Sequence, residues 1–405
     1  MSAARILVVT NGPLCRNPRV VKEATALGRA GYDVTVLTVR NHAPSEPYDL
    51  ELLRAAPFRR EIVEMRPGAG LLALRRRITL RLAREVASRL HWKTAAALGP
   101  AGALLNRMRA LPADLTIVHN EISHWAGVRL LSSGRRVAGD IEDWHSEDLR
   151  PFERLDRPLK ILRTTERALL HRAAYTTTTS HALADALHAR YGGTRPLVLT
   201  NSFPLQPDPR RATAAVPSFF WFSQRIGAGR GLEPFIAAWA RTRLPSRLVL
   251  LGEPSPGYHQ TLLRDLNPAQ RRRIEFLPLV APEALPTVIA RHDIGLALED
   301  SSIVNRDLTI SNKILQYLNA GLAVVATPTS GQREVVAHAP GSGVLIDLAH
   351  TDACATALDE LLADRVALAA RQHAARQAAK QRYSWERETP VLLNAVAAAL
   401  ARPSA

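Results

Sequence analysis

Short runs of β-branched apolar residues alternate along the chain with longer segments whose apolar positions recur every three or four residues. Residues 5–10 (RILVVT) form such a run, residues 17–31 have the helical period, and residues 32–39 (YDVTVLTV) form the next run. Strands of a parallel sheet are buried on both faces and therefore read as continuous apolar runs. The pattern predicts a βαβ unit with a right-handed crossover at the start of the chain.

The same alternation continues and then starts again after a break. In the first half it predicts strands at 114–119, 135–142, 173–180 and 196–204, and helices at 124–133 and 181–192. Residues 205–217 (LQPDPRRATAAVP) have no period and are rich in Pro and Ala, which is typical of a linker. The second half predicts strands at 218–223, 246–252, 273–279, 293–298, 322–327 and 343–347, and a last amphipathic helix at 384–401.

Two successive βα arrays predict an α/β protein with two doubly wound, Rossmann-like domains facing each other across a cleft. We expect domains at 1–205 and 218–384, a linker at 206–217 and a final helical segment at 385–405. Ligands of such sheets bind at the carboxyl ends of the strands, so we expect the site in that cleft.

A glycine-rich turn follows the first strand of the second array. The sequence RIGAGRG places Arg225 and Arg230 around Gly227, Gly229 and Gly231, just before a predicted helix. Glycines let the backbone approach a ligand, and a helix N-terminus attracts phosphate. Two guanidinium groups would neutralise a diphosphate, although a surface loop in an Arg-rich protein explains the motif equally well.

The stretch SNKILQYLNAG (311–321) predicts a short helix ending at Gly321. Ser311 or Asn312 is suited to cap its N-terminus, whereas Lys313 is unfavourable in a first turn unless an anion lies nearby. Gln316 lies one turn further, so it shares a face with Asn312 and Lys313. A solvated lysine is the alternative.

Carboxylates gather in GDIEDWHSEDL (139–149), directly after a predicted first-domain strand. Glu142, Asp143 and His145 are candidates for a base or for contacts with sugar hydroxyls, against the alternative of a solvated acidic loop that pairs with arginines. No matching metal-ligand cluster is evident, and we expect no metal.

The loop after the first strand, TNGPLCRN, lacks GxGxxG and so does not indicate a standard dinucleotide site. We expect Asn11, Gly12 and Arg16 to face the cleft, together with His119 at the end of another strand. Ordinary turn chemistry is the alternative for this loop.

Residues 54–93 hold eleven Lys or Arg against three Glu, in a chain whose net charge is +16. Within 71–93, Leu71, Leu74, Ile78 and Leu82 recur at helical spacing between arginines. This pattern is typical of a cationic helix on an anionic membrane surface, or of a helix packed on its own domain with a solvated Arg face. The segment has a single aromatic residue, so nucleic acid is disfavoured.

Two cysteines cannot form a disulfide framework, and no apolar run is long enough for a membrane span or a signal peptide. These features predict a cytoplasmic protein, with peripheral attachment to the inner face of the membrane as a hypothesis.

The chain resembles glycosyltransferase family 4, a group of retaining, sugar-nucleotide-dependent enzymes with the GT-B fold. NPRVVKEATALGRAGYDVTVL is similar to the family's opening βαβ, RIGAGRG to its Gly-Arg-Leu-x-x-x-Lys-Gly turn, and NKILQYLNAGLAVVAT to its donor-binding helix. The resemblance implies that Arg225 and Arg230 hold the donor diphosphate and that the final helix returns to the first domain.

The chain departs from the family pattern at several positions. Leu308 and Gln316 replace the usual glutamate pair, and Glu142-Asp143 replaces His-Asp. Gln316 retains an acceptor for a ribose hydroxyl without a charge. His145 or Glu142 is a candidate substitute for the missing histidine.

The resemblance implies retaining transfer from a nucleoside diphosphate sugar, without a metal or other cofactor, to a glycan or glycolipid acceptor. The basic helix adds the hypothesis that the acceptor is lipid-linked, as in cell-surface polysaccharide assembly. Another enzyme on this fold, such as a sugar-nucleotide epimerase, and an inactive scaffold protein stay open as alternatives.

Overall fold

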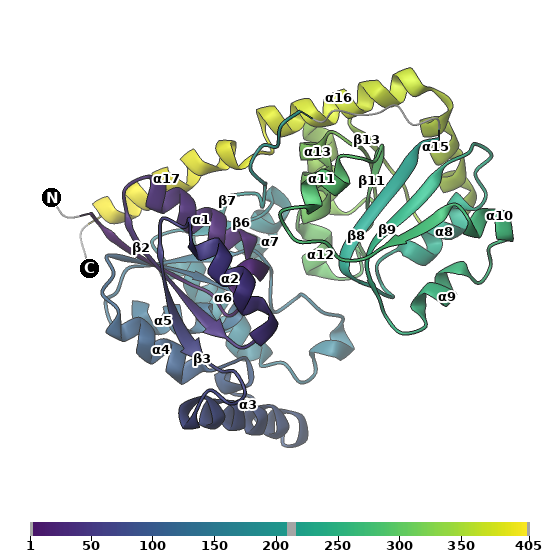
Figure 1. Ribbon diagram of the computed structural model, residues 1–405. Coiled ribbons are helices and arrows are strands. Elements are labelled where there is room, and N and C mark those ends of the chain that lie inside the picture. The colour runs from purple at the N-terminus through teal and green to yellow at the C-terminus, as the bar shows by residue number, and fades with distance from the viewer. Residues whose placement is uncertain (1–2, 209–215, 403–405) are drawn as a thin grey trace. The chain divides into compact units, whose positions relative to one another are not determined.

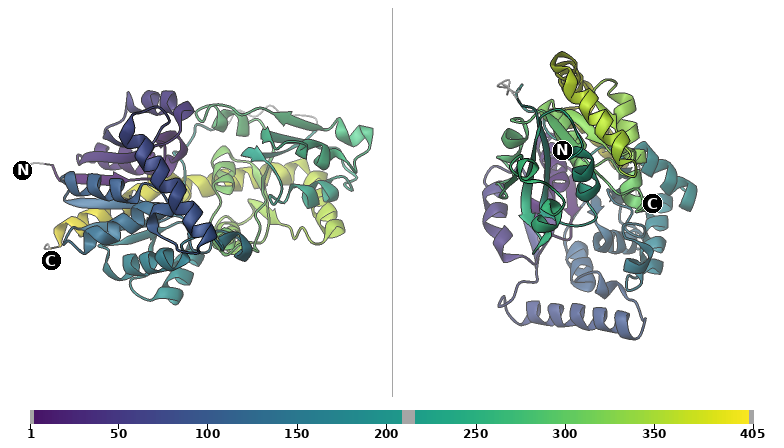
Figure 2. Two further views of the ribbon diagram at one scale, coloured as in Figure 1. Left: turned by 90° about the horizontal axis from the view of Figure 1, so that it is seen from below. Right: turned by 90° about the vertical axis from the view of Figure 1, so that its right-hand side faces the viewer.

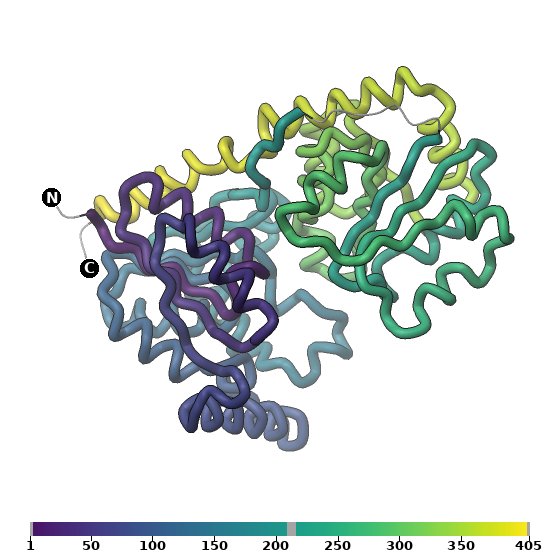
Figure 3. The backbone as a smooth tube through the Cα atoms, viewed as in Figure 1, coloured from purple at the N-terminus to yellow at the C-terminus, as the bar shows by residue number. Residues whose placement is uncertain are grey.

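The computed structural model describes residues 3–208 and 216–402 and divides into two compact units. Unit 1 contains the chain up to Leu199 and again from Thr389, and unit 2 contains Thr200–Glu388. Figure 1 labels the elements, and Figure 3 follows the chain out of unit 1 and back into it. The predicted linker, 206–217, includes residues 209–215, which lie outside the described residues.

Unit 1 is built on a seven-stranded parallel sheet in the order β3-β2-β1-β4-β5-β6-β7. Its strands are β1 (Arg5–Val9), β2 (Asp33–Arg40), β3 (Arg59–Glu64), β4 (Leu115–His119), β5 (Val137–Ile141), β6 (Thr176–Thr178) and β7 (Leu197–Val198). Its main helices are α1 (Pro18–Arg29), α2 (Glu46–Leu53), α3 (Leu71–Arg89), α4 (Ala101–Ala110), α5 (Glu121–Leu131), α6 (Leu159–Arg172) and α7 (His181–Tyr191).

Central strands of this sheet were predicted correctly because their side chains are buried throughout, as in β4 and β5. Strand β3, which pairs with β2 at the sheet edge, was not predicted from the sequence pattern. Its sequence, RREIVE, is mostly charged, and Val63 is its one fully buried position. An edge strand with polar side chains lacks the apolar run that marks a buried parallel strand.

Unit 2 is built on a six-stranded parallel sheet in the order β10-β9-β8-β11-β12-β13. Its strands are β8 (Ser218–Ile226), β9 (Arg247–Pro254), β10 (Ile274–Leu277), β11 (Ile294–Ala297), β12 (Ala323–Ala326) and β13 (Gly343–Leu345). Its helices are α8 (Leu232–Trp239), α9 (Tyr258–Leu263), α10 (Pro268–Arg271), α11 (Leu285–Ile289), α12 (Val304–Leu308), α13 (Asn312–Ala320), α14 (Ser330–His338), α15 (Thr351–Ala363) and α16 (Arg365–Gln381). The prediction of two doubly wound parallel sheets is confirmed.

The last helix, α17 (Trp385–Ala401), begins in unit 2 and ends in unit 1. Leu392 and Val396 on it are fully buried, and Arg402 just beyond it donates a hydrogen bond to the backbone oxygen of Ala174. The end of the chain is therefore part of the fold of unit 1.

Helix α3 lies at the border of unit 1 (Figure 2), and several of its large apolar side chains are exposed. Ala73 and Ala87 are its buried residues, whereas Leu71 is 84% exposed and Leu82 is 59% exposed. Leu80 of the same helix is partly buried and packs against the core of unit 1, so both interpretations of this helix stay predictions. Ala73, Ala87 and Leu80 contact the rest of unit 1, whereas Leu71, Leu74 and Leu82 are exposed.

Candidate functional sites of the two units

Helix α13 is held tightly against the sheet of unit 2. The hydroxyl of Tyr317 donates to the backbone oxygen of Leu296 at 3.2 Å, and a side chain at Gly295 would collide with the Tyr317 ring. Gly321 ends the helix with φ of 66°, a conformation that favours glycine. These contacts fix the N-terminus of α13 near the carboxyl ends of β8 and β11.

Lys313, in the first turn of α13, forms an ion pair with Glu299, which follows β11. Its Nζ lies 3.0 Å from Oε1 of Glu299, and only 13% and 11% of the two side chains are exposed. The ammonium also lies 5.7 Å from the centre of the Trp221 ring. The anion that the sequence analysis expected beside Lys313 is thus present in the protein itself, which explains how the lysine is accommodated in a first turn.

Ser311 occupies the N-cap position of α13, but its side chain accepts no capping hydrogen bond. Its hydroxyl oxygen is buried without a partner among the described residues. Asn312 is exposed, and Gln316 is half-buried one turn further along the helix. Within the described residues, the helix N-terminus therefore retains backbone N–H groups that no side chain satisfies.

The glycine-rich turn begins later than predicted, because β8 extends through a bulge to Ile226. Arg225 is an exposed residue of this strand and is paired with Glu253 of β9 in the backbone register. Gly229 and Gly231 have φ of 73° and 72°, so the turn needs glycine at both positions. Gly231 caps α8, and Gly227 precedes the turn.

The two arginines of this region differ in exposure. Arg225 is exposed and Arg230 is half-buried. Within the described part of the chain, neither guanidinium has a hydrogen bond or ion pair with another side chain. Both guanidinium groups therefore have free donors for an anionic ligand, whereas Lys313 would bind such a ligand alongside its partner Glu299.

Unit 1 contains a cavity of about 310 Å³ at the carboxyl ends of β1 and β4. Its lining residues are Asn11, Gly12, Asn17, Asn120, Glu121, His145, Asp148 and Arg157. The predicted Asn11, Gly12 and His145 come together here. Asn120, Glu121 and Arg157 were missed, although Asn120 directly follows a correctly predicted strand.

Asn120 has a strained backbone, with φ of 65°. Its side-chain oxygen accepts from the Thr10 hydroxyl at 2.7 Å and from the Asn11 backbone N–H at 3.2 Å. These bonds hold the two loops together and fix the floor of the cavity. Beside them, Arg157 forms an ion pair with Glu121, whose carboxylate also lies 4.0 Å from Nδ1 of His145.

Two predicted residues do not line this cavity. His119 is buried beneath it, with Nε2 at 2.5 Å from a Glu23 oxygen and Nδ1 at 2.9 Å from Asp140. Arg16 is exposed and contacts His42 at 3.3 Å. The structure thus places His119 in a buried ion cluster and Arg16 beside His42, and their predicted role in acceptor binding stays a prediction.

Arg19 completes the buried cluster. Its guanidinium donates twice to Asp140, at 2.6 and 2.8 Å, and once to the backbone oxygen of Leu199 at 2.7 Å. Burial alone would lower the pKa of His119, but the charges of Glu23 and Asp140 raise it to about 10. His119 is therefore a cation within the fold.

Glu142 and Asp143 lie next to this cluster, outside the lining of the cavity. Burial raises the pKa of Glu142 to about 7; the charge of Arg19 opposes this shift, and that of Asp143 adds to it. A carboxyl group that titrates near neutrality suits proton transfer. Burial lowers the pKa of His145 well below its usual value, so this histidine is neutral.

Two family models match the chain and together cover most of it. Residues 17–202 match the model described as glycosyl transferase 4-like domain, and residues 219–364 match the model described as glycosyl transferases group 1. The chain belongs to the group 1 glycosyltransferases. Enzymes of this group transfer a sugar from a nucleotide sugar, so this glycosyltransferase is an enzyme with a nucleotide-sugar donor.

Solved structures agree on the GT-B fold of the glycosyltransferase. A sucrose-phosphate synthase from Thermosynechococcus elongatus shares 15% identity, with 97% of this chain and 98% of that chain covered and a TM-score of 0.73. HepE from Anabaena, in complex with UDP-glucose, shares 14% identity over 97% and 99% of the chains, with a TM-score of 0.68.

A third similar structure is S. aureus TarM, in complex with Fondaparinux, alpha-GlcNAc-glycerol and UDP. It shares 9% identity with the glycosyltransferase over 98% of this chain and 100% of that chain, with a TM-score of 0.68. A search of curated protein sequences finds no significant match.

Among residues 3–208 and 216–402 of the glycosyltransferase, no helix is long and apolar enough to cross a membrane. In the same residues, His, Cys, Asp and Glu side chains form no group of three or more suited to a metal ion.

Proposed function

We propose that this glycosyltransferase transfers a sugar, with retention of anomeric configuration, from a nucleoside diphosphate sugar to a lipid-linked acceptor of cell-surface glycan assembly. The proposal for the donor rests on the position of Lys313 in the first turn of α13. Its partner Glu299 follows Leu298, whose Cβ lies 3.1 Å from where a side-chain carbon would stand at Gly231 of the glycine-rich turn. UDP sugars are the first donors to test, because HepE and TarM are both described as complexes with UDP or a UDP sugar.

In the proposed donor complex, Arg225, Arg230 and Lys313 bind the diphosphate. Cations and unpaired helix N–H groups stabilise the negative charge that develops on the leaving diphosphate. We propose that this charge stabilisation replaces a divalent metal. Asn312 and the unpaired hydroxyl of Ser311 lie at the same helix end, and Gln316 would accept a hydrogen bond from the ribose.

In the proposed acceptor complex, the sugar-binding groups are those of the cavity in unit 1. Asn11, Asn120 and Asp148 offer hydrogen-bonding groups suited to hydroxyls. Glu142 is the proposed proton acceptor or donor, because its pKa lies near neutrality. The negative charge of Asp143 would help to raise the pKa of Glu142.

The outward-facing α3 supports a membrane-bound acceptor. Leu71, Leu74 and Ile78 are exposed on a helix that also carries Arg75 and Arg81. Leucines that enter the acyl boundary and arginines that meet anionic headgroups would hold the protein on a membrane surface. The charge of this helix favours anionic lipid.

Donor use is tested by a panel of nucleoside diphosphate sugars in a thermal-shift screen, followed by turnover and NMR of the product anomer. Stabilisation by UDP sugars and a retained anomeric configuration are expected. Absence of turnover of every sugar nucleotide, with and without acceptor extract, would favour the scaffold alternative. Inversion of the anomer would refute the retaining mechanism.

A further inference from the structure

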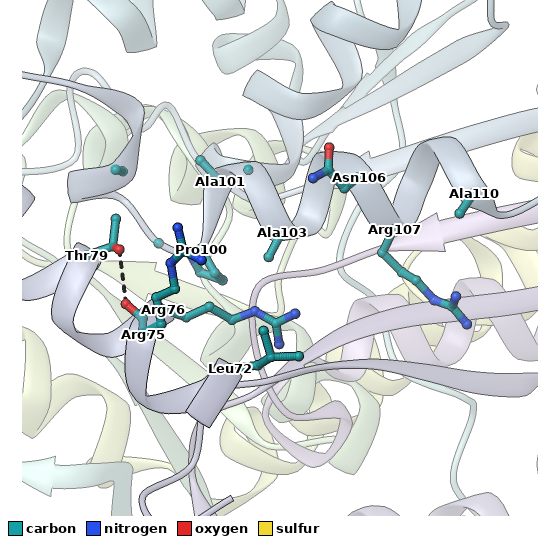
Figure 4. A pocket seen from close by; sticks show the side chains of 13 residues that line it. Leu72, Arg75, Arg76, Thr79, Pro100, Ala101, Ala103, Asn106, Arg107 and Ala110 are labelled. Carbon is teal, nitrogen blue, oxygen red and sulfur yellow. Dashed lines mark hydrogen bonds between the residues drawn. The ribbon is translucent and has the colours of Figure 1, made fainter. Parts of the chain in front are cut away.

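A second cavity of about 650 Å³ lies in unit 1 between α3 and α4, apart from the cavity at Asn11 (Figure 4). Its lining residues are Leu72, Arg75, Arg76, Thr79, Ala96, Gly99, Pro100, Ala101, Gly102, Ala103, Asn106, Arg107 and Ala110. This volume is in the range of small-molecule sites and exceeds what a single phosphate needs.

The charged groups of this cavity are three arginines, and its described lining contains no carboxylate and no aromatic ring. Arg107 is paired with Glu61 at 2.5 Å, and Arg76 donates to the backbone oxygen of Glu64 at 3.0 Å. A guanidinium has five N–H donors, so these bonds leave donors for a ligand. The cavity is therefore suited to an anion such as phosphate, and it lacks the stacking surface that a nucleotide base would use.

The opposite wall is apolar and small. Pro100, Ala101 and Ala103 belong to the start of α4, whose first turn has no side-chain cap. Leu72 lines the cavity and is 68% exposed, next to Leu71 on the outward face of α3. An apolar chain can thus continue from the cavity onto the leucine surface of the helix.

Gly99 lies close to both cavities of unit 1. It lines the cavity between α3 and α4, and a side-chain carbon at this position would lie 3.6 Å from Oδ1 of Asn11. Asn11 in turn lines the cavity assigned to the acceptor sugar. A group bound beside Gly99 therefore lies next to the proposed sugar site.

From these relationships we propose that the cavity between α3 and α4 binds the phosphate or diphosphate of a lipid-linked acceptor. Arg75, Arg76 and Arg107 bind the anion, the lipid chain runs past Leu72, and the attached sugar is directed towards Asn11. This inference rests on the proposed function and adds the part of the acceptor that the enzyme recognises.

The test uses the full-length protein and calorimetric titration with farnesyl phosphate, farnesol and inorganic phosphate, each below its aggregation limit. Gly102→Leu adds a bulky side chain to the lining of the cavity, and it should preserve folding because a side-chain carbon at Gly102 meets nothing within 4 Å and leucine favours helix more than glycine does. Arg75→Gln removes a lining cation. Arg77→Gln is the matched control, because Arg77 is a neighbouring exposed arginine outside the lining.

Farnesyl phosphate should bind more tightly than farnesol or inorganic phosphate. Gly102→Leu and Arg75→Gln should each weaken its binding by at least about tenfold, and Arg77→Gln by less than about twofold. Equal binding of farnesol, or equal losses in Arg75→Gln and Arg77→Gln, would overturn the proposal. The protein could instead bind phosphatidylglycerol vesicles but not farnesyl phosphate, with vesicle binding unchanged by Gly102→Leu. That result would assign α3 to the membrane surface and show that the cavity does not bind lipid phosphate.

A separate measurement distinguishes this inference from the proposed function. Transfer to a lipid-linked acceptor that Gly102→Leu leaves unchanged would refute the cavity assignment and keep the function. The opposite result is that Gly102→Leu abolishes farnesyl phosphate binding while the enzyme transfers no sugar to lipid-linked acceptors. That result would support the cavity as a lipid-phosphate site and refute the proposed acceptor.

Discussion

Lys313 and Glu299 form a partly buried ion pair at the N-terminus of α13, with 3.0 Å between Nζ and Oε1. A diphosphate bound at this helix end would meet a lysine that already has a counter-ion. We therefore expect the Lys313 ammonium to contact both Glu299 and the diphosphate when the donor binds.

Lys313→Ala should weaken donor binding or lower kcat/KM by about 1.5–3 kcal/mol, the scale of a hydrogen bond to a charged group. Glu299→Gln is the informative partner variant, because it removes the same ion pair and keeps the lysine. It should leave UDP-sugar affinity equal or higher. Equal losses in both variants, measured by titration, would show that the pair supports the fold and that the lysine does not bind the diphosphate.

Arg230→Ala should weaken donor binding by a similar amount, about 1.5–3 kcal/mol, because this guanidinium has no competing side-chain partner in the described structure. Arg241→Ala serves as the control, since Arg241 lies in the same unit and forms an exposed pair with Asp352. The control should change the affinity by no more than the small value of a surface ion pair. Unchanged kinetics in both Arg230→Ala and Lys313→Ala would refute the diphosphate assignment.

Gln316→Glu should strengthen donor binding by about 1 kcal/mol, because a carboxylate accepts a stronger hydrogen bond from a ribose hydroxyl than an amide does. The measurement is the affinity for UDP and for uracil, which lacks the ribose. Only UDP binding should respond. An unchanged UDP affinity would mean that Gln316 contributes to packing alone.

Ile78→Glu should reduce sedimentation with phosphatidylglycerol vesicles without lowering the unfolding temperature, because Ile78 is 50% exposed on α3. Val366→Glu in unit 2 is a matched control, since Val366 is 79% exposed on another helix. Binding should also fall with added salt. Equal and negligible sedimentation of the unmodified protein with anionic and neutral vesicles would contradict the membrane hypothesis.

The buried cluster around His119 predicts a loss of stability at alkaline pH. The pKa of His119 is about 10 in the folded chain against an ordinary value of 6.5, so its protonated form stabilises the fold fully below pH 6.5. That contribution is lost as the pH rises towards 10. His119→Gln should cost about 3–5 kcal/mol at pH 7, because it leaves Glu23 and Asp140 buried without this cation. The free energy of unfolding in urea should change less between pH 6.5 and 10 in the variant than in the unmodified protein. The same pH dependence in both proteins would argue against a charged His119.

Sequence patterns predicted the strands of both sheets wherever both faces of a strand are buried, as in β4 and β12. They failed at β3, whose polar edge position carries no apolar run. They also located Lys313 and Asn11 but not the partners of these residues. Glu299 and Asn120 meet them only through tertiary packing, over separations of 14 and 109 residues that no local pattern encodes.

The division of unit 1 between the two ends of the chain has a consequence for biosynthesis. Leu392, Val396 and Ala399 of α17 fill positions in the core of a unit whose other residues are translated first. While the ribosome is still producing unit 2, the apolar surface that awaits these three side chains stays uncovered. We therefore expect the first half of the nascent chain to reach its final fold only after α17 has left the exit tunnel, and a fragment ending at Leu199 to need a chaperone or to aggregate.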